Sequence, residues 1–449
     1  MKKIWIINHY ATTMYNNQGG RHFWFAKYLK LNGYQPIIIC ANAYHNSKEF
    51  IDTKNEKFTI KTCNTDNISL DFIFVKTTIA VKNDIRRLIN IFVFYKNLFP
   101  VLEKLLNIYD KPDIILASSV HPLTLVAGIK IANKLNIPCI CEIRDLWPEA
   151  IFYASNPFKS FARCFTFFLT KSEYWIYKKA DALIFTKEGD IDYIKEKKWD
   201  LENGGEVDLK KVFYINNGVD LDDFNQSILK KTSNEKFTCV YTGSIRPINN
   251  VELLVDTADY LKEYNDIEIL VYGDGFLLDT LIKKLITLGL TNIKFMGNVN
   301  KQDIPTILSN SSLNIDLYPK SNWNWKRGSS SNKLFEYLAA GKPIVSSCKM
   351  KYSIIDKYKC GIELEKPTPR MMGEAILKIK NMHKDDYDEY GINAKIAATH
   401  YDFKLLTKKL ITIVAAISDR HRTDGVPPST VAAISDRHNI SQCTPPVGN

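Results

Sequence analysis

The sequence lacks the features that would place the chain across a membrane or in an oxidising compartment. Its nine cysteines are scattered, without a C-x-x-C pair, which is typical of free thiols in a reducing compartment and argues against a metal site. The longest stretch without a charged residue, 114–129, is shorter than a membrane span requires. The apolar run that begins at Ile4 is too short for a signal peptide. We therefore expect a cytoplasmic chain without a transmembrane helix.

A dinucleotide fingerprint of the form G-x-G-x-x-G is also missing after the first predicted strand. The connection to the first long helix instead ends in Gly19 and Gly20, and glycines there let backbone approach a ligand. Acidic residues are outnumbered, with 49 Asp and Glu against 60 Lys and Arg and a net charge of +11. Such an excess favours an anionic partner, which includes nucleic acid, a membrane surface and a phosphorylated substrate.

What the sequence does contain is two series of alternating strands and helices. We predict strands at 3–8, 34–41, 58–62, 72–76, 113–117, 137–143, 182–186 and 212–215, then at 237–242, 267–272, 293–296, 313–317 and 344–346. Helices are predicted at 21–31, 84–107, 123–134, 158–178, 190–198, 251–264, 277–288, 303–309, 333–340 and 370–382. This alternation indicates an α/β fold of two doubly wound, Rossmann-like domains. The cleft between two such domains is the default ligand site.

The chain divides into four predicted parts, namely residues 1–216, 217–384, a helical segment at 385–413 and a tail at 414–449. In the tail, the eight residues 414–421 recur at 431–438, but two repeats are too few for a solenoid. Two Pro-Pro pairs, at 427–428 and 445–446, favour a loosely ordered, dispensable tail.

The stretch 328–345 has the pattern of a ligand loop. Small residues from Gly328 lead into a helix that Gly341 ends. The first turn of a helix offers unpaired N–H groups and a positive dipole end, which suit a diphosphate. Glu336, one turn in, can accept hydrogen bonds from a ribose diol. The alternative is an ordinary loop and helix, in which Glu336 only complements the dipole.

Two further loops follow predicted strands, where doubly wound sheets carry their functional residues. The first, 118–122, contains His121, and the second, 144–149, contains Arg144, Asp145 and Glu149. His121 is either a site residue or a core histidine at a strand end. Asp145 and Glu149 either join Arg144 in a polar cluster or cap the segment that follows.

Six short motifs in this order resemble the retaining family-4 glycosyltransferases, which have the two-domain GT-B fold with a central cleft. The resemblance covers about residues 1–412 and is strongest to enzymes that build bacterial capsule or O-antigen polysaccharide. The motifs are Gly19-Gly20, S-V-H-P-L at 119–123, E-I-R-D-L-W-P-E at 142–149, N-G-V-D at 217–220, Y-T-G-S-I-R at 241–246 and the stretch 332–345, which begins N-K-L-F-E.

The resemblance implies that a sugar moves from a nucleotide-diphosphate sugar to a hydroxyl acceptor with its anomeric configuration kept. The first domain would bind the acceptor and the second the nucleotide sugar, with no cofactor, no metal and no nucleic acid. It implies His121 and Asp145 as catalytic residues, and Arg144 and Glu149 on the acceptor side. The implied donor-binding residues are Gly19, Gly20, Arg246, Gly328, Ser329, Asn332, Lys333 and Glu336.

The sequence departs from the family pattern at two positions. Gly328 stands where the first glutamate of the family's E-x7-E often lies, and Pro247 follows Arg246 where a lysine is frequent. Two D-x-D strings, at 190–192 and 220–222, are expected to be structural. Two other functions stay open, a GT-B-fold epimerase acting on a UDP-sugar and a non-catalytic subunit that binds a nucleotide sugar.

Aromatic and basic residues are concentrated at 151–179, which holds ten aromatics and five cations against one acid. A helix of this composition can lie in a bilayer interface. The segment 84–107, with Arg86, Arg87, Lys96 and Lys104, offers a second such surface. We expect contact with the anionic inner face of the cell membrane, which would bring the cleft to a polyprenyl-diphosphate-linked saccharide acceptor. The alternative is that both helices pack their aromatics on the sheet.

Overall fold

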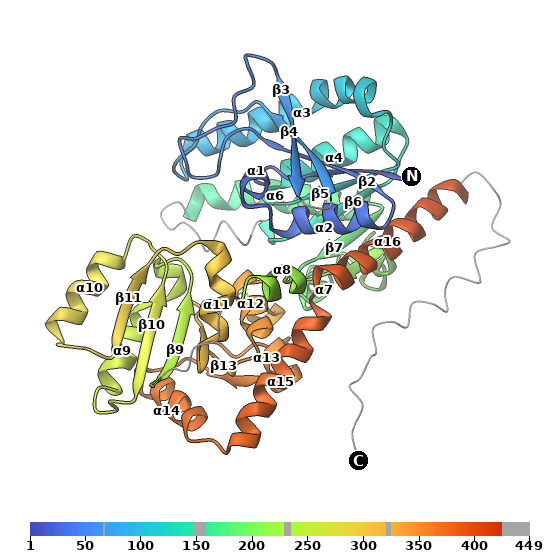
Figure 1. The fold of residues 1–449 in the computed structure, drawn as a ribbon. Helices are drawn as coiled ribbons and strands as arrows, with labels where there is room; N and C mark the ends of the chain where they lie inside the picture. The colour runs from blue at the N-terminus through green and yellow to red at the C-terminus, as the bar shows by residue number, and fades with distance from the viewer. Residues whose placement is uncertain (66–67, 148, 150–158, 229–234, 320–324, 424–449) are drawn as a thin grey trace.

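The computed structural model describes residues 1–65, 68–147, 149, 159–228, 235–319 and 325–423. Its two sheets form two separate α/β layers, one above the other in Figure 1. The predicted fold class, two Rossmann-like domains with mainly parallel sheets, is confirmed. Within the described residues, no helix combines the length and hydropathy that a membrane crossing requires.

The first sheet has eight strands in the order β3-β4-β2-β1-β5-β6-β7-β8. All neighbours are parallel except β3 and β4, which form an antiparallel pair. The strands are Lys3–Ile7 (β1), Gln35–Ala41 (β2), Phe58–Thr65 (β3), Ile68–Val75 (β4), Ile114–Ser118 (β5), Cys139–Ile143 (β6), Ala182–Phe185 (β7) and Val212–Tyr214 (β8). The central strands are apolar and buried throughout because helices cover both faces of the sheet.

Helices pack on both faces of the first sheet through two separate apolar cores. One core contains side chains of Ile85–Tyr109 (α3), Pro122–Leu135 (α4), Lys159–Lys179 (α6) and Asp190–Glu196 (α7). The other contains side chains of Arg21–Leu31 (α2) and Phe403–Thr423 (α16). A short helix, Thr12–Asn17 (α1), precedes α2. The connection between α1 and α2 lies at the carboxyl end of β1, where the site begins.

The second sheet has six parallel strands in the order β11-β10-β9-β12-β13-β14. They are Phe237–Thr242 (β9), Ile267–Tyr272 (β10), Ile293–Gly297 (β11), Leu313–Asp316 (β12), Ile344–Ser346 (β13) and Gly361–Glu363 (β14). One face is covered by Glu252–Tyr260 (α9), Leu278–Thr287 (α10) and Pro369–Lys380 (α14). The other carries Leu221–Gln226 (α8), Ile304–Ser309 (α11), Asn332–Ala340 (α12), Ile354–Tyr358 (α13) and Lys384–His400 (α15).

The predicted boundary of a loose tail at residue 414 is wrong. Helix α16 continues to Thr423, and Val414 and Ile417 are buried against the first sheet. These residues continue the helical spacing of Leu406, Leu410 and Ile413. The first copy of the repeat therefore belongs to a packed helix that returns from the second domain to the first (Figure 1). The second copy lies outside the described residues.

Candidate functional site

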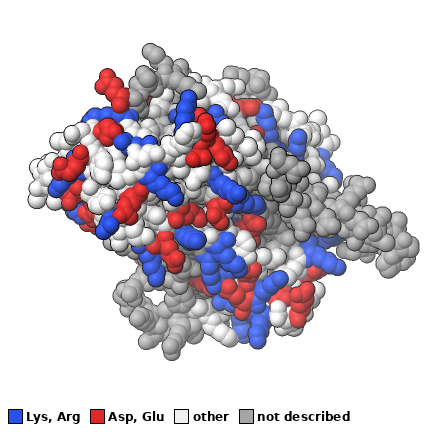
Figure 2. All heavy atoms as spheres, turned by 90° about the horizontal axis from the view of Figure 1, so that it is seen from below, with Lys and Arg blue, Asp and Glu red and all other residues white. Residues whose placement is uncertain are grey.

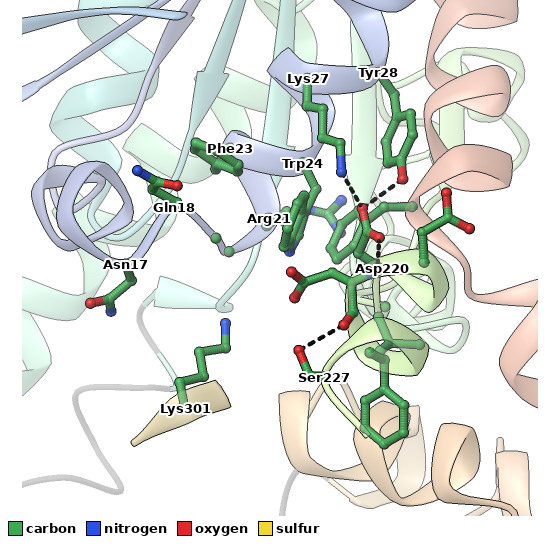
Figure 3. Close-up of a pocket in the computed structure, with 18 of the residues that line it drawn as sticks. Asn17, Gln18, Arg21, Phe23, Trp24, Lys27, Tyr28, Asp220, Ser227 and Lys301 are labelled. Atoms are coloured by element: carbon green, nitrogen blue, oxygen red, sulfur yellow. Dashed lines mark hydrogen bonds and ion pairs between the residues drawn. The ribbon is translucent and has the colours of Figure 1, made fainter. Parts of the chain in front are cut away.

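A cavity of about 690 Å³ lies between the two domains. The first domain lines it with the α1–α2 connection, which contains Gly19 and Gly20, and with one side of α2. The second domain lines it with Lys301 and with Asn332 and Glu336 of α12. Figure 3 shows Asn17 and Gln18 above this space and Lys301 pointing into it from below. The structure thus brings together four residues predicted to bind the donor.

Helix α12 begins at this cavity with its backbone N–H groups available. Ser331 is the N-cap residue, and its side chain makes no capping hydrogen bond. Glu336 is half-buried one turn further along. Burial raises the pKa of its carboxyl, and the nearby Lys301 acts in the opposite direction. A ligand at this end of α12 would meet N–H donors and then a carboxylate acceptor.

Lys333 is the second residue of α12 and does not line the cavity. Its Nζ is 3.7 Å from Oδ1 of the buried Asp316, too far for a hydrogen bond, and 4.8 Å from the ring centre of Tyr241. Within the described chain this Nζ has no hydrogen-bond partner. Burial lowers the pKa of Lys333, while Asp316 opposes that shift. The ammonium group therefore has donors to spare for an anion.

Two residues of the loop before α12, Gly328 and Ser329, are packed against neighbouring segments. Gly328 has a φ of +93°, and a Cβ on it would lie 2.9 Å from the backbone oxygen of Tyr352, so only glycine fits without strain. The hydroxyl of Ser329 is 2.8 Å from the Tyr318 hydroxyl, and it also accepts from the Ser331 N–H. Gly328 and Ser329 are both buried and are not among the residues that line the cavity. Their contacts shape the loop.

In the first domain, the buried carboxylate of Glu142 organises the site. Its Oε1 accepts from Nε of Arg21 at 2.7 Å, and its Oε2 accepts from the Ser118 hydroxyl at 2.6 Å and lies 2.9 Å from Nε2 of His22. Burial alone would raise the pKa of this carboxyl, but Arg21 and His22 outweigh it and hold that pKa well below its usual range. Glu142 is therefore an anion at neutral pH with its acceptors in use.

His121, the predicted catalytic histidine, is the N-cap residue of α4 and is buried. Its Nε2 lies 2.6 Å from Nδ1 of His9, whose ring stacks on Phe94. Burial lowers the pKa of His121 to about 3, so the imidazole is neutral at pH 7. The Nδ1 atom of His121 has no hydrogen-bond partner within the described chain. His121 does not line the cavity described above.

The remaining predicted residues are dispersed. Arg246 is exposed at the start of a short 3-10 helix, Asp145 is exposed, and Arg144 is half-buried. Glu149 lies 3.7 Å from Lys197 of α7. Within the described residues, Arg144, Asp145 and Glu149 form no ion pair with one another.

Both D-x-D strings have protein partners. Asp192 lies 3.1 Å from Nζ of Lys351 and accepts from the Tyr352 hydroxyl at 2.8 Å. Asp220 caps α8 and accepts from the Tyr28 hydroxyl at 2.6 Å (Figure 3). In the described part of the chain, no three His, Cys, Asp or Glu side chains are grouped as a metal site.

Three residues at the site were missed from sequence. Arg21 directly follows Gly20, Lys301 follows a strand end, and His9 lies two residues beyond β1. Each stands where a strand leads into a loop or helix, which is the one signal that could have found them. Their partners are far away in sequence.

Residues 236–381 match the family model of glycosyl transferases group 1. A search of curated proteins gives no match to the chain. Among solved structures, sucrose-phosphate synthase from Thermosynechococcus elongatus is 12% identical, with a TM-score of 0.66 over 94% of this chain and 100% of that one. HepE of Anabaena, solved in complex with UDP, is 15% identical, with a TM-score of 0.61 over 93% and 100%.

WaaG, described as a glycosyltransferase involved in lipopolysaccharide biosynthesis, is 12% identical, with a TM-score of 0.58 over 92% of this chain and 99% of that one. At these identities the likeness concerns the fold, in which two Rossmann-like domains are joined in the GT-B arrangement. The family match of the second domain and the GT-B fold of the whole chain together support a glycosyltransferase.

Proposed function

We propose that the protein is a retaining glycosyltransferase, which moves a sugar from a nucleotide-diphosphate sugar to a hydroxyl acceptor without a metal or other cofactor. The observation that carries this proposal is the interdomain cavity, where Gly19 and Gly20 face the start of α12 and Glu336. The solved HepE complexes contain UDP or UDP-glucose, which favours a nucleotide sugar as the ligand.

The chemistry follows from where negative charge develops. When the glycosidic bond to the donor breaks, charge builds on the diphosphate leaving group, and preorganised donors stabilise it. The uncapped N–H groups of α12 and the Nζ of Lys333 can serve as such donors. The exposed Arg246 adds a further cation, while the Glu336 carboxylate holds the ribose diol. These cations would do the work that a metal ion does in other transferases.

For the acceptor we propose a lipid-linked saccharide of capsule or O-antigen assembly, bound on the side of His121, Asp145, Arg144 and Glu149. Support for a membrane-bound substrate comes from α3. Opposite its buried face, this helix exposes an apolar stripe at i, i+3, i+4 and i+7, formed by Ile85, Leu88, Ile89 and Phe92. Arg86 and Lys96 are exposed beside the stripe, as anionic lipid requires.

The structure changes which residues could contact lipid. Arg87 is buried and donates to Asn46 and the Ala80 oxygen, so its predicted lipid contact is wrong. In the segment 151–179, Phe167 and Phe168 are exposed, whereas Tyr177 is buried in the core. The first five aromatics of that segment lie outside the described side chains. The face of the molecule shown in Figure 2 carries acidic and basic side chains side by side. It therefore offers no continuous basic surface to anionic lipid.

Flotation with anionic liposomes tests the membrane contact. The wild type should float at low salt and less at high salt, because charge screening weakens the attraction to lipid. Replacing Leu88, Ile89 and Phe92 together by serine should abolish flotation. A matched control replaces Ile392 and Ile396, exposed on α15, and should float as the wild type does. Equal flotation of both variants would remove α3 from the membrane contact.

Product analysis tests the proposed reaction. The protein is incubated with a panel of nucleotide sugars and lipid-linked acceptors, and the products are analysed by mass spectrometry, with NMR for the anomeric configuration. Sugar transfer with retained configuration is expected. Conversion of a UDP-sugar to its epimer without transfer would indicate the epimerase, and binding without turnover would indicate the non-catalytic subunit. Inverted configuration would overturn the retaining mechanism.

A further inference from the structure

The buried network around Glu142 does not end in the first domain. Arg21, which donates its Nε to Glu142, is itself buried and turns the other end of its guanidinium toward the linker after β8. Its Nη2 donates to the Ile215 oxygen at 2.8 Å, and its Nη1 donates to the Asn216 oxygen and to Oδ1 of Asn217. One side chain thus joins a carboxylate of the first sheet to the interdomain linker.

The linker in turn holds the loop before α12. The Nδ2 of Asn216 donates to the Ser329 oxygen at 2.9 Å, and the Nδ2 of Asn217 donates to the Ser330 oxygen at 2.6 Å. Both asparagines are buried. The two carbonyls belong to the residues that lead directly into α12, whose N–H groups and Glu336 face the cavity. The linker therefore contacts the loop at its last turn before the helix.

The same interface has a second attachment along α2. Lys27 and Tyr28, six and seven residues after Arg21, both reach Asp220, at 3.3 and 2.6 Å (Figure 3). Asp220 also caps α8 of the second domain. Helix α2 thus contacts the linker region at two points about two turns apart. Two attachments fix the orientation of α2 relative to the linker, whereas a single one would allow rotation about it.

We propose that Arg21, Asn216 and Asn217 form a positioning relay that sets the α12 loop of the second domain against the glycine connection of the first. This inference rests on the proposed function, because it gives the relay its purpose of holding the donor's two binding surfaces in register. A guanidinium is a rigid planar fork with several fixed donors. Moving the loop would leave buried donors and acceptors unpaired, and each such group is costly.

The discriminating variant is Asn217→Asp. It keeps an oxygen for Arg21 but replaces the donor to Ser330 by a second oxygen, so the link to the loop is lost and a negative charge is added. The matched control is Asn292→Asp, because Asn292 is another buried asparagine of the second domain, whose Nδ2 donates to the Ala258 oxygen at 2.8 Å. If Asn217→Asp does not fold, Asn217→Ala removes the same donor without a charge.

Amide hydrogen exchange measures the relay directly on the full chain. We expect the amides of residues 329–334 to exchange at least about tenfold faster in Asn217→Asp than in the wild type. In Asn292→Asp, these amides should exchange at their wild-type rates, when the proteins are compared under conditions that give them equal free energies of unfolding. Unchanged exchange of residues 329–334 in the Asn217 variant, or equal acceleration in both variants, would overturn the relay.

Calorimetry with UDP, GDP, CDP and ADP gives the functional readout. The diphosphate that binds the wild type should bind Asn217→Asp about tenfold more weakly and Asn292→Asp unchanged. An unchanged affinity in Asn217→Asp would show that the loop position does not matter for binding and would refute the relay's proposed purpose. Wild type that binds none of the four diphosphates would contradict the proposed function, while the exchange comparison would still decide on the relay.

Discussion

The two domains present their site residues in opposite states of hydrogen bonding. In the first domain, Glu142 is bonded to Arg21 and Ser118 and lies against His22. In the second, Nζ of Lys333 and Oδ1 of Asp316 have no hydrogen-bond partner within the described residues, and they lie 3.7 Å apart. The Glu142 carboxylate is thus hydrogen-bonded, whereas Lys333 and Asp316 form an ion pair whose facing atoms make no hydrogen bond within the described residues.

This difference has a physical meaning. A satisfied buried network resists displacement, because breaking it exposes or strands charges. A buried donor without a hydrogen-bond partner destabilises the folded protein by about 1–3 kcal/mol, and a bound anion that accepts from this donor removes that penalty. We infer that the first domain acts as the fixed surface and that donor binding completes the second. Some buried atoms of the first domain, among them Nε2 of His9 and Nδ1 of His121, are also unpartnered in the described chain.

The largest expected effect comes from removing the charge at the centre of the satisfied side. Glu142→Gln should lower the free energy of unfolding by about 3–5 kcal/mol, because Arg21 would remain as an uncompensated buried charge. Chemical denaturation measures this loss. A loss below about 1 kcal/mol would mean that the network is not the anchor of the first domain.

The difference in unfolding free energy between wild type and Glu142→Gln should depend on pH. The pKa of Glu142 is lowered in the folded state, so its contribution to stability is present above the usual pKa near 4.5 and is lost as pH falls through the folded value. The gap between wild type and Glu142→Gln should therefore narrow in acid, below pH 4.5. A gap that is constant from pH 7 to acid conditions would contradict the ionised assignment.

On the unsatisfied side, binding should change more than folding. Glu336→Ala should weaken nucleotide-sugar binding by about 1.5–3 kcal/mol, as expected for a charge-assisted hydrogen bond to a ribose diol. Calorimetry measures the affinity, and thermal unfolding provides the control. If the folded variant binds its donor with wild-type affinity, Glu336 has no part in the site.

Helix α16 connects the two sides and gives a smaller effect. Ending the chain after Val414 removes Ile417, whose burial stabilises the fold by about 1.5–3 kcal/mol, and should lower the melting temperature by a few degrees. A chain that ends at Thr423 keeps the helix and should melt as the full chain does. Equal melting of all three chains would restore the prediction of a loose tail from residue 414.

The smallest expected effect is on turnover. His121→Ala should reduce the rate at least about tenfold if its free Nδ1 contacts the transferring sugar. His9→Ala should reduce the rate less, because His9 only orients His121 through the 2.6 Å contact. Donor affinity should change little in either variant. Wild-type turnover of a folded His121→Ala protein would make the residue structural.

The sequence was a good guide to the elements and a poor guide to their partners. Apolar strands such as β2 and β5 are predictable because burial on both faces favours β-branched runs. Strand β14 has three residues and leaves no such run. The Arg21–Glu142 bond joins residues 121 positions apart, and no local pattern specifies such a pairing.

Site residues divide in the same way. Glu336, Gly19 and Gly20 line the cavity. They could be predicted because a helix start and a glycine-containing turn are local features of the sequence. Arg87 was misassigned because a cation on an apolar helix looks exposed until its buried acceptors are known. The tail boundary is wrong because the two Pro-Pro pairs favoured a loose segment from residue 414, although the apolar spacing at 414–421 continues α16.

A crystal structure with a bound nucleoside diphosphate tests the central claim most directly. The ligand is the one among UDP, GDP, CDP and ADP that raises the melting temperature most. We expect its ribose hydroxyls within about 3 Å of the Glu336 carboxylate, and its diphosphate between the start of α12 and the connection that holds Gly19 and Gly20. A nucleotide bound away from this cavity, with Glu336 free of ribose, would contradict the assignment of the donor site.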